Sequence, residues 1–293
     1  MKHFKVYIII LLLASYVSPA KCSDTRLSVF VSIPPQAYFV ERIAGRFANV
    51  HVLNAKGQDP HIFSPTPKQL VALSKSNLFF TIGLPFEKRL IEKIKKINSS
   101  LKIVPTNKNI RQKPLIGHKK NNNPTDPDLH IWLSPPLIKV QAKNIAQALT
   151  VADPAHAGEY EKNLTGFLED IDQLDIEIRK MLLPYKGDSF YVFHPAFGWF
   201  GQTYGLHQKS VEIEGKIPTP KQLSRLIKSA RSENIRVIFV QPQFDQRCAL
   251  TVAQAVGAEI VVINPLEKNV LRNLKYMSLK VERALRKAHD NNR

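Results

Sequence analysis

Cysteine is nearly absent from this sequence of 293 residues, which contains only Cys22 and Cys248. At most one disulfide can form, and the fold therefore depends on hydrophobic cores, for which 44% of the residues are available. Cys248 falls in a predicted helix, where we expect a free, structural thiol. The sequence also lacks the His-Glu-x-x-His, Gly-x-Ser-x-Gly and Cys-x-x-Cys patterns. Their absence argues against an enzyme.

Long hydrophobic runs are absent too, apart from one short run at the amino terminus. Residues 1–20 are interpreted as a secretory signal peptide, with a basic start at Lys2 and Lys5 and an apolar run from Val6 to Ala14. Ser18-Pro19-Ala20 supplies the small residues of a cleavage site. The run is too short to cross a bilayer. We therefore predict an exported, periplasmic protein without a transmembrane anchor.

Cys22 follows the predicted cleavage site, which raises the alternative of a lipid-anchored amino terminus. The residue before it is Lys21, where such processing needs a small side chain. Lipidation is therefore the less favoured alternative.

The formal charge of +18 becomes +16 once Lys2 and Lys5 are removed with the signal. Such a charge is compatible with binding to nucleic acid or to an anionic surface. The basic residues are spread over the predicted helices and are not gathered into one run with aromatic residues. We expect no nucleic-acid partner, and keep a basic surface protein that binds polyanions as an alternative.

The stretch from Asp153 to Pro184 has the pattern of one long helix. Asp153 can cap its start, Pro154 fits the first turn, and Pro184 closes the end. Apolar residues recur at steps of four and three along one face. They are Tyr160, Leu164, Phe167, Ile171, Leu174, Ile178 and Met181. A helix of this length can join two lobes.

A repeat on either side of this helix supports that interpretation. Pro65-Thr-Pro-Lys-Gln-Leu70 and Pro218-Thr-Pro-Lys-Gln-Leu223 are identical, and each has Thr and Pro where a helix would begin. The sequence therefore predicts an α/β protein of two similar parallel-sheet α/β lobes joined by one long rigid linking helix. The predicted divisions are 21–152 for the N-terminal lobe, 153–184 for the helix and 185–293 for the C-terminal lobe.

Short apolar runs alternate with helical patterns in both lobes, as in parallel sheets covered by helices. The predicted strands are Leu27–Ile33, Val50–Leu53, Leu78–Gly83, Lys102–Val104, Ser189–Phe193, Val211–Ile213, Val237–Val240 and Ile260–Ile263. Asn107 to Asp128 holds almost nothing apolar and is predicted to be a mobile surface loop.

Several polar residues stand just after predicted strands, where open parallel sheets bind ligands. They include His194, Gln241 and Asn264, and two further histidines, His61 and His130, lie in loops. The three histidines have no local spacing motif, so only the fold can bring them together. Taken alone, each histidine is compatible with an ordinary hydrogen-bonded imidazole.

The surroundings of these residues resemble a known family. Asp59-Pro60-His61 precedes the first Pro-Thr-Pro-Lys-Gln-Leu, and the other matching segments are Leu129-His130-Ile131-Trp132-Leu133-Ser134-Pro135, Phe193-His194-Pro195-Ala196-Phe197-Gly198, Tyr204-Gly205-Leu206 and Asn264-Pro265-Leu266. Together, from about Leu27 to the carboxyl end, they are similar to the high-affinity zinc and manganese periplasmic binding proteins of metal-importing ABC transporters. The resemblance implies a metal buried between the lobes, and an ABC transporter permease with its cytoplasmic ATPase as partners of a monomer.

By position, the resemblance implies His61 and His130 as ligands from the first lobe and His194 from the second. Manganese-preferring relatives carry a carboxylate where His194 stands, so the implied metal is Zn²⁺, with Mn²⁺ less favoured. Two positions depart from the family pattern. Asn264 replaces the usual Asp of the fourth ligand, and Gln241 replaces a Glu. The fourth position is left open between Asn264, a water and an unidentified carboxylate.

A secreted zinc-dependent hydrolase is a further alternative, because three histidines plus water are also a catalytic arrangement. Such an enzyme needs a general base beside the metal, and no motif supplies one. The protein is therefore interpreted as a binding protein.

Overall fold

The computed structural model describes residues 26–54, 57–115, 127–212, 218–233, 235–245 and 247–290. The predicted signal peptide, Cys22 and the central part of the predicted loop, with His118, lie outside the described residues. Among the helices of the described ranges, none is both long enough and apolar enough to cross a membrane.

The N-terminal lobe is built on a four-stranded parallel sheet in the order β2-β1-β3-β4. Its strands are β1 (Leu27–Val31), β2 (Ala48–Val52), β3 (Leu78–Thr81) and β4 (Lys102–Pro105). Its α-helices are α1 (Pro34–Ala44), α2 (Pro67–Ser74), α3 (Pro85–Ile97) and α4 (Pro135–Ala152), with short 3₁₀ turns η1 (Gly45–Phe47) and η2 (Ile131–Leu133). The central strands β1 and β3 are almost entirely buried, because helices cover both faces of the sheet.

The C-terminal lobe repeats this topology in the order β6-β5-β7-β8, again with all strands parallel. Its strands are β5 (Ser189–Val192), β6 (His207–Ser210), β7 (Val237–Val240) and β8 (Glu259–Val262). Its helices are α6 (Gly198–Tyr204), α7 (Pro220–Ser232), α8 (Arg247–Val256) and α9 (Val270–Asp290). The free thiol of Cys248 lies in α8, as predicted.

The strand predicted at Val211–Ile213 is wrong at Val211 and Glu212, which lie in no strand, and Ile213 lies outside the described residues. The strand in this region is β6, which ends at Ser210. Its sequence, His-Gln-Lys-Ser, has no apolar residue, because β6 is an edge strand with only Gln208 fully buried. Gly205, in the left-handed conformation (φ 73°), ends α6 and lets the strand begin two residues later.

The repeated hexapeptide does what the sequence predicts. Thr66 and Thr219 each accept a hydrogen bond from the backbone N–H three residues on, and Gln69 and Gln222 reach back to the backbone N–H of the threonine. Both are complete capping boxes, which satisfy two otherwise unpaired groups at the helix start. They begin α2 and α7, which connect equivalent strands of the two lobes.

The long helix α5 runs from Ala157 to Leu182, after a 3₁₀ turn at Pro154–His156 and before another at Leu183–Tyr185. It begins later than predicted, because the Asp153 carboxylate accepts the Tyr160 hydroxyl and pairs with His156 in the 3₁₀ turn. The predicted apolar stripe is buried from Tyr160 to Ile178, but Met181 is only half-buried and Leu182 completes the stripe.

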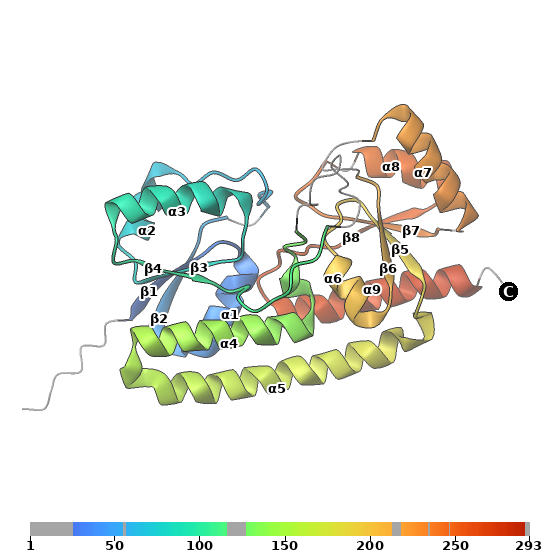
Figure 1. The fold of residues 1–293 in the computed structure, drawn as a ribbon. Helices are drawn as coiled ribbons and strands as arrows, with labels where there is room; N and C mark the ends of the chain where they lie inside the picture. Colours follow the sequence, from blue (N-terminus) through green and yellow to red (C-terminus); the bar gives the residue numbers. More distant parts are fainter. Residues whose placement is uncertain are drawn as a thin grey trace, which may run out of the picture.

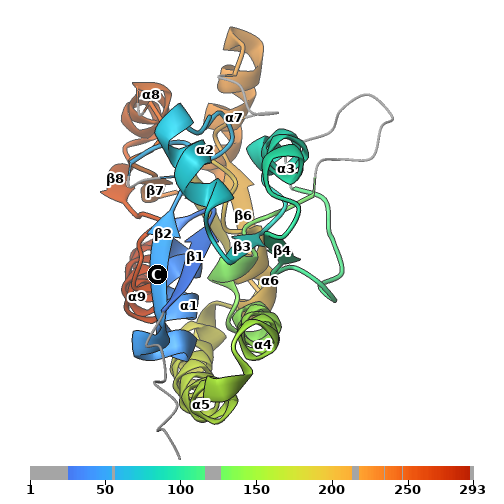
Figure 2. The ribbon, with the colours of Figure 1, turned by 90° about the vertical axis from the view of Figure 1, so that its left-hand side faces the viewer.

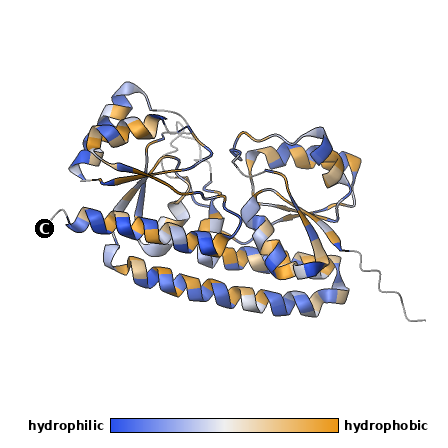
Figure 3. Cartoon of the chain, turned by 180° about the vertical axis from the view of Figure 1, so that it is seen from behind, coloured by the Kyte–Doolittle hydropathy of each residue, from blue (hydrophilic) through white to orange (hydrophobic). Residues whose placement is uncertain are grey.

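Helix α5 lies along the same side of both lobes (Figures 1 and 2). It contacts α1 and α4 of the N-terminal lobe and α6 and α9 of the C-terminal lobe. Seen from behind, α5 and α9 carry alternating hydrophilic and hydrophobic residues (Figure 3). Ion pairs join it to its neighbours: Asp170 to Arg42 of α1, Asp172 to Lys139 of α4 and Glu177 to Lys275 of α9. One helix thus supports both lobes.

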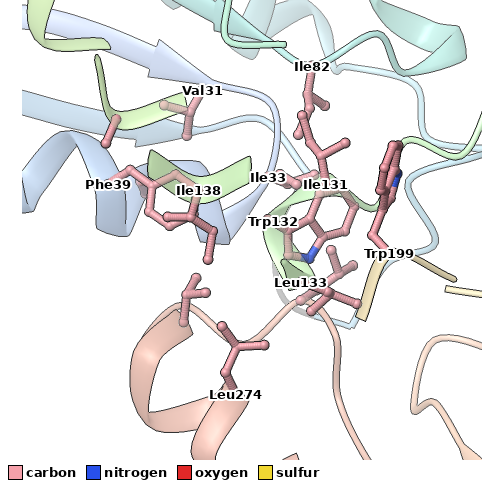
Figure 4. Packing of buried hydrophobic residues seen from close by; sticks show 14 of the residues in the cluster. Val31, Ile33, Phe39, Ile82, Ile131, Trp132, Leu133, Ile138, Trp199 and Leu274 are labelled. Atoms are coloured by element: carbon pink, nitrogen blue, oxygen red, sulfur yellow. The ribbon is translucent and has the colours of Figure 1, made fainter. Parts of the chain in front are cut away.

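The two lobes also share a hydrophobic core where they meet. Figure 4 shows Trp132 and Leu133 of the N-terminal lobe beside Trp199 and Leu274 of the C-terminal lobe. The Trp132 indole donates to the Pro265 carbonyl and the Trp199 indole to the Asp128 carbonyl, both at 2.8 Å. The predicted fold class, two parallel-sheet α/β lobes joined by a long helix, is confirmed.

Candidate metal centre

The three predicted histidines meet between the two lobes. His61 lies in the loop after β2, His130 just before η2, and His194 just after β5. Their ring centroids are 5.1–5.9 Å apart, and one nitrogen of each ring lies within 4.8 Å of the others. Two sheets meeting through their loops therefore produce a compact set of three imidazoles.

His130 is fixed by the aspartate two residues before it. Asp128 Oδ1 accepts both the His130 backbone N–H, at 3.1 Å, and ring Nδ1, at 2.9 Å. Its other oxygen lies 3.8 Å from Lys113 Nζ. Because Nδ1 faces the carboxylate, Nε2 is the ring nitrogen left for the site.

His194 is held from three sides. Its Nδ1 lies 2.8 Å from Glu212 Oε2, and its ring stacks on Phe244 at 4.4 Å between centroids. The Gln241 amide accepts from the His194 N–H and donates to its carbonyl, at 3.0 and 3.2 Å. Burial lowers the pKa of His194, while the hydrogen bond to Glu212 opposes this shift. A neutral imidazole follows, and its buried Nε2 has no hydrogen-bond partner among the described residues.

His61 repeats the local geometry of His130. Its backbone N–H donates to Oδ1 of Asp59, two residues before it, at 2.8 Å. Burial raises the pKa of Asp59, and the His61 hydrogen bond opposes the shift. Asp59 also interacts electrostatically with His130, His194 and Glu212. Asp59 is therefore a third carboxylate near the site, after Asp128 and Glu212.

The donor set fits a zinc ion. Zinc prefers nitrogen ligands at 2.0–2.1 Å in tetrahedral geometry, which places two ligand atoms about 3.3 Å apart. The three imidazole nitrogens, within 4.8 Å of one another, need only small movements to reach this spacing. Two rings already carry a carboxylate on the opposite nitrogen, the usual arrangement of metal-binding histidines.

Comparisons with known proteins agree with this site. Residues 29–284 match the family model described as ZnuA, zinc-uptake complex component A, periplasmic. The chain belongs to the ZnuA family. A crystal structure of ZnuA superimposes with a TM-score of 0.83 at 35% identity, over 89% of this chain and 99% of that one.

Two curated relatives of the chain are also metal-binding by name. A putative metal-binding protein of Chlamydia muridarum is 28% identical over 251 residues, 85% of this chain and 88% of that protein. The manganese ABC transporter substrate-binding lipoprotein PsaA of Streptococcus anginosus is 28% identical over 253 residues, 81% and 79% of the two chains. The resemblance inferred from the motifs is confirmed, and so is the class of function, a substrate-binding protein for a divalent metal.

The two amides that depart from the family pattern have different surroundings in this ZnuA-family chain. Gln241, fully buried, uses both ends of its amide on the His194 backbone. Asn264 Oδ1 accepts from Gln243 Nε2 at 2.7 Å and from the Leu266 N–H at 3.1 Å. Gln241 therefore positions His194, whereas Asn264 belongs to the loop that receives the Trp132 indole.

The sequence did not reveal the carboxylates behind the rings. Asp59 and Asp128 each stand two residues before a site histidine, so the repeated Asp-x-His pattern was an available signal. Asp128 was assigned to a mobile surface loop, but it is buried. Glu212 gives no such signal, because it is 18 residues from His194 and follows a strand that carries no apolar residue.

Proposed function

We propose that this chain captures Zn²⁺ between its lobes in the periplasm and delivers it to the membrane permease of an ABC transporter, which a cytoplasmic ATPase drives. The observation that supports this proposal is the set of three imidazoles from two lobes, because one nitrogen of each ring lies within 4.8 Å of the others. The proposed ligands are His61, His130 and His194, with Asn264 at the fourth position. A cleaved signal at 1–20, the division at 152/153 and 184/185, and a monomeric state belong to the same proposal.

Zinc is favoured over manganese by the chemistry of the donors. Three neutral imidazoles suit Zn²⁺, whereas Mn²⁺ prefers sites rich in oxygen. The buried, neutral His194 supports this preference, because burial disfavours its protonated form and leaves a nitrogen lone pair.

The fourth ligand separates two versions of the site. Asn264 can contribute its amide oxygen only by giving up its bonds with Gln243 and Leu266. Asp59 is a further carboxylate near the rings, besides Asp128 and Glu212, and its charge would offset that of the dication. We propose Asn264, with Asp59 or a water as the alternatives that mutation must exclude.

Release is proposed to proceed by local rearrangement. Helix α5 packs on both lobes, and two indole hydrogen bonds cross between them beside the site. A helix without an interior proline bends little. The loop of His61 is the proposed path of exit, because His61 is half-exposed whereas His130 and His194 are buried.

Metal analysis and titration test this function. Purified protein is stripped with a chelator, then titrated with Zn²⁺ and Mn²⁺ in separate calorimetric experiments. We expect one zinc ion per chain and at least about tenfold weaker manganese binding, as the ligand types imply. Failure to bind zinc would overturn the proposal. The hydrolase alternative would be favoured if zinc-loaded protein turned over ester or peptide substrates at a rate abolished by His194→Ala.

A further inference from the structure

The exposed charges of the molecule are arranged unequally on its two sides. Helices α2, α3, α7 and α8 lie on one side of the two sheets, and α4 and α5 lie on the other (Figures 1 and 2). The linking helix α5 carries seven acidic residues against three basic ones. Helix α3 has five basic residues and a single exposed acidic one, and α7 has four basic residues and no acidic one.

Three acidic side chains of α5 pair with other helices of the molecule. Asp170, Asp172 and Glu177 form ion pairs with basic residues of α1, α4 and α9. By contrast, the exposed basic side chains of α3 and α7 form no ion pair within the described ranges. They are Lys88, Arg89, Lys93, Lys95, Lys96, Lys221, Arg225, Lys228 and Arg231.

Helices α2 and α7 are equivalent in the two lobes, and the loop that leads into α2 carries the site residue His61. The repeated capping boxes place Lys68 and Lys221 at the same position of α2 and α7, one residue after the first proline of each helix. A groove of about 330 Å³ between α2 and α3 is lined by Ile62, Phe63, Phe86 and Arg89. Ile62 follows the site residue His61 directly and is 83% exposed.

We propose that this side, here called the basic face (the exposed surface of α2, α3 and α7 with Ile62), binds the anionic lipid headgroups of a membrane. Lysines and arginines without ion-pair partners in the described ranges lie on the same side of both lobes, so an extended negative surface would attract them. An exposed isoleucine among basic groups suits the interface between headgroups and acyl chains. The inference adds to the proposed function, because it turns the metal site toward the membrane that holds the permease.

Vesicle binding of the metal-free protein tests the basic face without involving the metal. The protein is sedimented with vesicles of phosphatidylcholine, with and without phosphatidylglycerol, at low and high salt. We expect binding only to the anionic vesicles and its loss at high salt, because salt screens the charges. Equal binding to both vesicles, or none to either, would overturn the proposal. A protein that bound an acidic peptide of the permease but neither kind of vesicle would also overturn the proposal.

Charge-reversal variants locate the face. Lys88→Glu with Lys93→Glu and Lys96→Glu changes α3, and Lys221→Glu with Arg225→Glu and Lys228→Glu changes α7. Each basic residue near an anionic bilayer contributes about fivefold to partitioning, so each triple variant should lower it by more than about tenfold. Glutamate keeps helix propensity close to that of lysine, and circular dichroism verifies the fold.

The matched control is a triple variant of α9. This helix is also basic, but it lies on the side of the molecule that carries α5, opposite the basic face. Arg272→Glu, Lys280→Glu and Arg283→Glu change the net charge by the same amount. We expect partitioning within about twofold of that of the unmodified chain. An equal loss in this control would show that net charge alone drives binding, and would overturn the basic face. Zinc titration of all three variants separates this result from a failure of the metal site, which the variants leave intact.

Discussion

The two lobes share a strand order and a repeated helix cap, yet they contribute to the metal site from different positions. The N-terminal lobe supplies His61 after β2 and His130 before η2, whereas the C-terminal lobe supplies His194 directly after β5. The strand equivalent to β2 is β6, which is followed by Glu212, and this carboxylate supports His194. Equivalent loops therefore carry a proposed ligand, His61, in the N-terminal lobe, and in the C-terminal lobe the carboxylate that supports a different proposed ligand, His194.

The lobes also differ in how their ligands are fixed. His130 donates its backbone N–H to the neighbouring Asp128, whose same oxygen also contacts its ring Nδ1, a local arrangement that needs only a short segment of the chain. His194 depends on Glu212, Gln241 and Phe244, which are 18 to 50 residues away and come together only in the folded lobe. We infer that the C-terminal half of the site needs a completely folded lobe, whereas the N-terminal half needs mainly its own loops.

The largest effect is expected from the ligands themselves. His130→Ala and His194→Ala should each weaken zinc binding by more than about 100-fold, beyond the 10–100-fold typical of supporting residues. His61→Ala should do the same if this half-exposed ring is a full ligand. Competition against a chelating dye measures the affinities. The exposed His51→Ala and His207→Ala are controls from each lobe, and native-like affinity after the His194 change would contradict the zinc site.

The supporting carboxylates should separate the two lobes. Asp128→Asn and Glu212→Gln each keep an acceptor but remove its charge, and should weaken zinc binding about 10–100-fold. Asp128→Asn should also lower the free energy of unfolding, because it leaves the half-buried Lys113 without its counter-ion. Urea unfolding of the metal-free variants measures this difference. Equal unfolding free energies would mean that Lys113 does not depend on Asp128.

The two amides provide a comparison within one lobe. Asn264→Asp should tighten zinc binding, by roughly tenfold or about 1.4 kcal/mol, if the side chain reaches the ion. Gln241→Glu should not, because glutamate cannot donate to the His194 carbonyl and would bury a charge. The same dye competition compares them. Tightening by the Gln241 change alone would mean that Gln241, and not Asn264, lies next to the metal.

The helix caps should respond alike in the two lobes. Thr66→Ala and Thr219→Ala each remove one side-chain cap, which costs about 1 kcal/mol of unfolding free energy. Thermal unfolding compares the variants, with Thr165→Ala on the exposed surface of α5 as the control. Because each capping box is complete, we expect equal losses. A loss confined to one lobe would show that the lobes unfold separately.

The smallest change is expected in overall size. Solution scattering of metal-free and zinc-loaded protein should give radii of gyration that agree within error, because α5 and the shared core hold both lobes. Hydrogen exchange should instead report altered protection around His61. A clear decrease in radius on zinc binding would refute the rigid linkage.

The sequence alone determined the features that depend on local physical chemistry. The 3.6-residue period of apolar residues predicted α5, and the Thr-Pro-x-Gln pattern predicted the capped starts of α2 and α7, because both effects act within a few residues of the chain. The three histidines were found through motifs that surround each of them. The edge strand β6 was missed because its residues are polar and its identity comes from pairing with β5.

Only the tertiary structure decided which groups face the histidines and where the charges are exposed. Glu212 meets His194 because β6 lies beside β5, and Gln241 meets it because β7 lies on the other side. The basic residues are spread over the predicted helices in the sequence, yet α5 pairs three of its acidic residues with basic residues of other helices, while α3 and α7 leave their basic residues exposed and without ion pairs in the described part of the chain. Both features depend on how segments distant in the sequence pack together, so no local sequence pattern reveals them.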